Sequence, residues 1–165
     1  MLIDILRRLL AFVLLVLAQG LVFNRVQLFH CATPLLFIYF VITFPRNYPK
    51  WASLLWSFAL GLCVDMFSNT PGLAAASTTF MAALQPYLLQ LFLPREAEEH
   101  LRTAAATLGY GKFFTMATIM VLLFCLVFFA LEAFNFYDWQ QWLLSVGGSA
   151  AITLILIMAL ESLRH

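Results

Sequence analysis

The sequence predicts an all-α membrane protein, a polytopic bundle of six transmembrane helices, from three observations. The 165 residues are 64% hydrophobic and only 10% charged, whereas soluble domains carry roughly 25% charged residues. The mean hydropathy is +0.94. The apolar residues also fall into runs that suit the roughly 30 Å hydrocarbon core of a bilayer. We therefore expect residues 1–165 to form a single integral membrane domain in contact with lipid.

Six apolar segments are the candidates for these helices. They cover residues 6–23, 32–44, 51–67, 73–93, 113–134 and 142–160. The second is the weakest, because Pro34 and Pro45 bracket it and proline interrupts a helix. An earlier start near Gln27, with Pro34 as a kink, is the alternative. In the fourth segment, Pro86 predicts a kink near the middle.

The basic residues predict the orientation of the bundle. If the N-terminus is cytoplasmic, eight of the nine Lys and Arg residues lie inside and only Arg25 lies outside, as the positive-inside rule expects. This places both termini in the cytoplasm. Arg7, Arg8 and the apolar run after them also resemble a cleavable signal peptide. That run continues to Phe23, which favours an uncleaved first helix.

The longest polar segment, residues 94–112, is predicted to be a cytoplasmic loop. It begins with Pro94 and an acidic cluster and reaches Gly109, a pattern typical of a helix with its stop signal. Two interpretations stay open: a solvated surface helix, or a docking element for a partner.

No constellation of residues in the sequence is typical of an enzyme or a metal site. The three histidines are far apart in the sequence, at His30, His100 and His165, and so are the three cysteines, at Cys31, Cys63 and Cys125. Their spacing fits no known metal-ligand motif, and no phosphate-binding loop or nucleophile elbow occurs. We expect a non-enzymatic protein with no catalytic residue, metal or cofactor. The scattered basic residues also predict no nucleic-acid binding.

The most distinctive segment runs from Gly61 to Gly72. Asp65 carries the first charge in the apolar run that starts at Trp51, and a carboxylate at a helix centre in the membrane costs roughly 2.5–3.5 kcal/mol. A polar turn follows, in which Pro71 fixes φ and Gly72 permits a positive φ. We interpret Asp65 as an acceptor for backbone amides that ties two antiparallel helices together. The alternative is a carboxylate that only reaches the membrane interface.

Small residues recur in three of the predicted helices, where they let helix backbones approach closely. Ser53, Ser57 and Gly61 form a ridge with a four-residue spacing, and we expect this ridge to be exposed and to bind a partner helix. The groups at 74–77 and 147–151 are the other two, and packing inside the bundle is the default expectation for them. Gln19 is expected to bond a neighbouring helix.

The block Leu60, Gly61, Leu62, Asp65, Phe67, Ser68 and Gly72 resembles the signature of the MreD family, the small membrane component of the bacterial rod-shape system. The positions of Pro34, Pro45 and Pro86 also fit this family. The resemblance covers residues 10–95. It implies a fold similar to the S-components of energy-coupling-factor transporters.

The resemblance further implies a location in the bacterial cytoplasmic (inner) membrane. It also implies a subunit of the elongasome that regulates cell shape and lateral peptidoglycan synthesis. Its expected partner is an MreC-like bitopic protein, with MreB, RodA and a penicillin-binding transpeptidase as further partners, and a homo-oligomer is compatible with it. The alternative function is a vitamin-binding S-component. Such proteins carry an Ala-x-x-x-Ala contact motif in the first span, whereas Ala11 and Ala18 are seven residues apart here. An unrelated membrane protein is the third class.

Overall fold

The computed structural model describes residues 1–23, 25, 34–45, 48–93, 108–133 and 138–164. Every regular element in these ranges is helical, which agrees with the predicted class. In chain order the elements are α1 (Leu2–Leu17), the π-helical turn η1 (Ala18–Phe23), α2 (Ile38–Ile42), α3 (Lys50–Ser68), α4 (Leu73–Phe92), α6 (Tyr110–Glu132) and α7 (Trp139–Arg164).

Four of the helices in the described part of the chain are long and apolar enough to cross a membrane. They are α1 continued into η1 (Leu2–Val22), α3, α6 and α7. These four helices support a membrane-embedded protein. The helix α4 has 20 residues, but its sequence contains Gln85, Pro86 and Gln90. It continues as one helix through Pro86.

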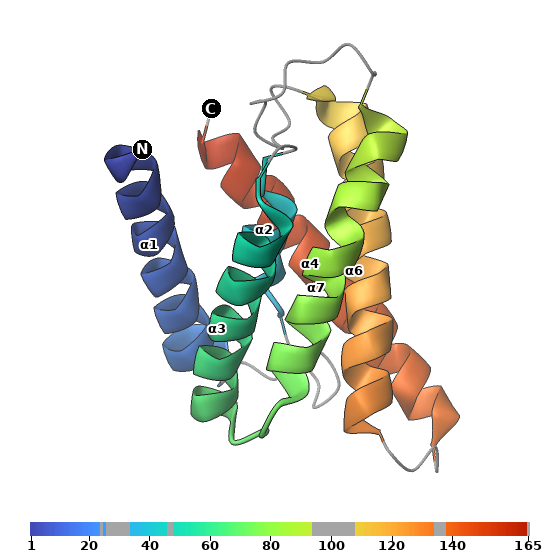
Figure 1. Ribbon diagram of the computed structural model, residues 1–165. Helices are drawn as coiled ribbons and strands as arrows, with labels where there is room; N and C mark the ends of the chain where they lie inside the picture. Colours follow the sequence, from blue (N-terminus) through green and yellow to red (C-terminus); the bar gives the residue numbers. More distant parts are fainter. Residues whose placement is uncertain (24, 26–33, 46–47, 94–107, 134–137, 165) are drawn as a thin grey trace.

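The bundle has both chain ends at the same end, as the predicted orientation requires (Figure 1). The turn between α3 and α4 lies at the opposite end, together with the beginning of α7. Apart from the second, the predicted spans agree with the observed helices to within about one helical turn. The predicted cytoplasmic helix in the loop 94–112 lies mostly outside the described residues.

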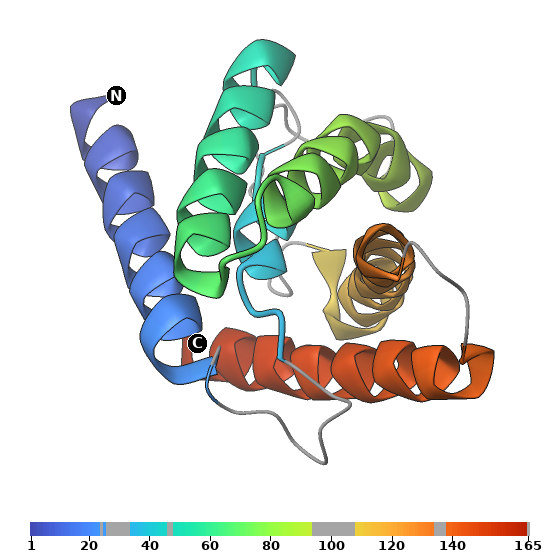
Figure 2. The ribbon, with the colours of Figure 1, turned by 90° about the horizontal axis from the view of Figure 1, so that it is seen from below.

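The second predicted span, residues 32–44, differs most from expectation. Its first two residues lie outside the described part. Residues 34–37 are not helical, and α2 has five residues, which extend over about 7.5 Å at 1.5 Å per residue. The prediction of a transmembrane helix is therefore wrong for the described part of this span. Instead, α2 lies in the middle of the bundle, among α3, α4, α6 and α7 (Figure 2).

Hydrogen bonds from distant helices explain how this non-helical backbone is accommodated, because backbone groups at membrane depth need partners within the protein. Gln19 of η1 donates from Nε2 to the Pro34 carbonyl at 3.0 Å, and its Oε1 accepts from the Leu36 amide at 3.1 Å. The amide of Leu35 donates to the Thr153 hydroxyl of α7 at 3.0 Å. Gln19 thus bonds a neighbouring segment as expected, although that segment is not a regular helix.

The other end of this segment is held by α4. Gln85 Nε2 donates to the Phe44 carbonyl at 3.1 Å. Between the two ends, Phe37 is fully buried and meets Phe124 of α6 edge to face, with ring centroids 5.4 Å apart. The short α2 is consequently the centre of the hydrophobic core, and the longer helices surround it.

Candidate functional site

Asp65 joins the end of α3 to the beginning of α4. Its side chain is buried, and its two carboxylate oxygens accept hydrogen bonds from the amides of Ala74 and Ala75, at 2.8 and 3.0 Å. The Thr70 hydroxyl donates to Oδ1 at 3.0 Å. Amides in the first turn of a helix have no partner within it and carry the positive end of its dipole. The carboxylate satisfies two of them, which is the tie between antiparallel helices that the sequence predicts.

The polar turn has the local geometry that this tie requires. Asn69 adopts the left-handed conformation with φ 57°, and its amide donates to the Asp65 carbonyl. Gly72 precedes α4 with φ 83°, the positive angle expected for it. Pro71 is exposed and Ser68 is half-buried. The turn therefore positions the first amides of α4 above the carboxylate.

The ridge Ser53, Ser57 and Gly61 is enclosed within the chain. Ser53 is 5% exposed and Ser57 is 0% exposed. A Cβ atom added at Gly61 would lie 2.5 Å from the Ala75 nitrogen and 2.6 Å from the Thr78 hydroxyl oxygen. This hydroxyl also donates to the Ser57 carbonyl at 2.8 Å. The expectation of an exposed ridge is wrong, because small residues of α4 already occupy the close approach at Gly61.

Phe67, another residue of the MreD-like block, lies against η1. A Cβ atom added at Gly20 would come within 2.7 Å of the Phe67 ring. This contact packs the end of α3 on the turn that also carries Gln19. The block therefore helps to position the side chain that satisfies the irregular second segment.

The third group of small residues, at the beginning of α7, is divided between two faces. Ser149 and Ala150 point inward and are buried. Gly147 and Ala151 are exposed, and a Cβ atom added at Gly147 would meet no atom within 4 Å. Gly147 and Ala151, like Ala76 of the group at 74–77, therefore face the surroundings of the bundle.

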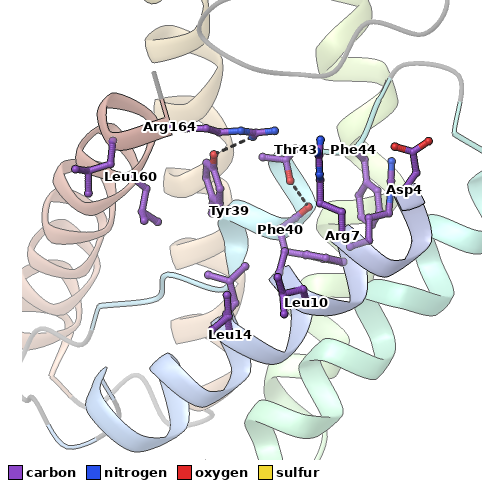
Figure 3. Close-up of a pocket in the computed structure, with 14 residues that line it drawn as sticks. Asp4, Arg7, Leu10, Leu14, Tyr39, Phe40, Thr43, Phe44, Leu160 and Arg164 are labelled. Carbon is purple, nitrogen blue, oxygen red and sulfur yellow. Dashed lines mark hydrogen bonds between the residues drawn. The ribbon is translucent and has the colours of Figure 1, made fainter. Parts of the chain in front are cut away.

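A polar cluster that sequence analysis missed lies at the end of the bundle that holds both termini. Glu161 of α7 is 2% exposed, and its Oε2 accepts the Tyr39 hydroxyl hydrogen at 2.7 Å. Arg164 donates to the same phenol oxygen at 3.3 Å (Figure 3). An acid one turn before an arginine, at the end of an apolar helix, is the signal available in the sequence. It does not identify Tyr39 as the partner.

This cluster borders a cavity of about 470 Å³ between α1, α2 and α7. Arg7, Arg8 and Arg164 line it together with Asp4. The remaining lining is mainly apolar and includes Leu10, Leu14, Phe40 and Leu160.

Arg8 is positioned by aromatic rings as well as by its place on α1. Its guanidinium carbon lies 4.1 Å from the centroid of the Tyr48 ring and 5.4 Å from that of Phe44. Cations are attracted to aromatic faces at such distances. The cavity thus combines held positive charge with apolar walls.

Among the described residues, no group of three or more His, Cys, Asp and Glu side chains is placed to hold a metal ion. Comparisons with protein-family models, curated proteins and solved structures find no match for this chain.

Proposed function

We propose that this protein is a non-enzymatic membrane subunit of the bacterial elongasome, which organises lateral peptidoglycan synthesis by binding an MreC-like single-span partner within the bilayer. In this proposal, the protein interacts with MreB, RodA and a penicillin-binding transpeptidase through that complex. The MreD-like block supports this role, since Asp65, Gly61 and Phe67 hold the helical frame together.

The observation that carries the proposal is the outward face of α7. Gly147 and Ala151 lie on one side of the helix, between Leu144 and Ile155, which are 68% and 69% exposed. Their spacing places all four on a single helix face. In a bilayer, helices associate through close van der Waals packing at small residues, because lipid already solvates apolar side chains. This face therefore suits a partner helix that packs over Gly147.

Replacing Gly147 by leucine tests the proposal. Because an added side chain there meets nothing within 4 Å, Gly147→Leu should insert and fold like the wild type. It should lose co-purification with the MreC-like partner, since its bulk occupies the approach of the partner backbone. In a rod-shaped host that depends on this protein, cells expressing the variant should become round.

Gly111→Leu is the matched control. Gly111 is also exposed with open space around it, but it lies in the first turn of α6, so this variant should retain the partner. If Gly147→Leu binds the partner as well as Gly111→Leu does, the assigned face is wrong. Wild-type protein that ignores the partner and retains a thiamine-, biotin- or riboflavin-like ligand would favour the S-component alternative instead. Self-association lost in Gly147→Leu, without any partner binding, would assign the face to a homo-oligomer.

A further inference from the structure

The cavity between α1, α2 and α7 is amphiphilic along the axis of the bundle. Arg7 and Arg164 lie toward the chain ends, and the apolar residues lie deeper (Figure 3). At 1.5 Å per residue, Leu10 and Leu14 lie about 4.5 and 10.5 Å below Arg7 along α1. Leu160 lies about 6 Å below Arg164 along α7. Charge at the mouth and apolar walls below reproduce the polarity of one membrane leaflet.

The cavity is also open toward the lipid along α1. Leu10 is 62% exposed and Leu14 is 59% exposed, although both line the cavity. Of the residues of α1, Val16 is the buried one. An amphiphile can therefore enter sideways from the bilayer, without passing through the aqueous phase.

The charges at the mouth favour an anion. Three arginines line the cavity against one carboxylate, that of Asp4. The Glu161 carboxylate nearby accepts the Tyr39 hydroxyl, and Tyr39 in turn accepts a hydrogen bond from Arg164. This arrangement holds the Arg164 guanidinium at the rim of the cavity (Figure 3). Arginine also offers several donors in a planar fork that matches a phosphate group.

We infer that this cavity binds one acidic phospholipid, with its phosphate between Arg7, Arg8 and Arg164 and an acyl chain along Leu10, Leu14 and Leu160. Basic pockets between transmembrane helices are suited to anionic lipid headgroups. The volume of about 470 Å³ lies in the range of roughly 300–1,000 Å³ typical of small-molecule pockets. A free phosphate would leave the apolar walls unused, and a zwitterionic lipid would bring its cationic amine close to the arginines, which repel it. The inference is independent of the proposed function.

Native mass spectrometry of the full-length protein tests the inference. The protein, purified in a neutral detergent, is offered equal amounts of phosphatidylglycerol and phosphatidylcholine with identical acyl chains. We expect one phosphatidylglycerol to be retained in preference to phosphatidylcholine by about tenfold or more, since each basic residue contributes about a fivefold gain (about 1 kcal/mol). Soluble glycerol phosphate, which lacks the acyl chains, should not bind.

Two pairs of variants locate the lipid. Arg7→Gln should weaken phosphatidylglycerol retention by about fivefold, whereas Lys112→Gln, which removes a charge at the same end of the bundle but outside the cavity, should not. Leu14→Trp keeps every charge but fills the cavity, and it should lower retention. Leu9→Trp lies on the same helix away from the cavity lining and should leave retention unchanged.

Three results would overturn the inference. The first is equal retention of the two lipids, and the second is an equal effect of each variant and its control. The third is a protein adduct, in place of the expected lipid adduct, at a photoreactive residue introduced at Leu10 in native membranes. A protein adduct there would assign the cavity to a partner helix or to a second copy of the chain.

Discussion

The hydrogen bonds of Asp65 make a quantitative prediction. Replacing Asp65 by alanine removes three of them and leaves the buried amides of Ala74 and Ala75 without acceptors. A bond to a charged group contributes about 1.5–3 kcal/mol, and loss of a helix cap alone costs about 0.5–2 kcal/mol. Polar contacts between membrane helices are weaker, about 0.6 kcal/mol on average. Balancing these values, we expect Asp65→Ala to lower the free energy of unfolding by about 3 kcal/mol.

Two further variants divide this loss among the contacts. Asp65→Asn keeps one acceptor oxygen for one α4 amide, so it should lose about half as much as Asp65→Ala. Thr70→Val removes the hydroxyl donor and leaves both amides bound, so about 1 kcal/mol should be lost. The assay is unfolding of purified protein by increasing SDS in mixed micelles, followed by far-ultraviolet circular dichroism.

An Asp65→Ala variant that unfolds within about 0.5 kcal/mol of the wild type, the range of ordinary surface substitutions, would show that these hydrogen bonds do not stabilise the fold. A different outcome would assign a different role. If the alanine and asparagine variants are both fully stable and both fail to bind the partner, the negative charge itself serves that partner.

The other predictions use the same preparation. Gly61→Leu should fail to give folded protein, because even a Cβ atom there overlaps the α4 backbone; normal yield on gel filtration would contradict that packing. Gln19→Leu, which removes both hydrogen bonds to the second segment, should destabilise the protein by about 2 kcal/mol in the SDS assay, and an unchanged midpoint would contradict it. In a cysteine-free background, cysteines at Asn69 and Asp138 should react with an impermeant thiol reagent from outside the cell, whereas one at Lys112 should not; external labelling of Lys112 would reverse the orientation.

Most helices could be predicted from the sequence because the bilayer imposes their length and polarity. The run from Trp51 to Val64, for example, has no charge that would allow an aqueous interpretation. The positive φ of Gly72 also follows from local turn chemistry. These features depend on residues that are close together in the chain, so the order of residue types is enough to predict them.

The second segment could not be predicted, because its conformation depends on distant partners. The irregular backbone around Leu35 is stabilised by Gln19 and by Thr153, and Thr153 lies 118 positions later in the chain. The contact between Tyr39 and Glu161 spans 122 positions. At Gly61, the sequence shows a small residue suited to close helix packing. It does not show that the helix packed there is α4 of the same chain and not a helix of another protein.

The central position of α2 has a consequence for the biogenesis of the protein. Residues 34–37 and the five residues of α2 contain too little regular helix to enter lipid by themselves, and their polar backbone groups are satisfied in part by Thr153 of α7. That partner leaves the ribosome more than a hundred residues after Leu35. This segment therefore acquires all of its hydrogen-bond partners only after α7 has been synthesised, so folding of this chain does not proceed strictly from the N-terminus to the C-terminus.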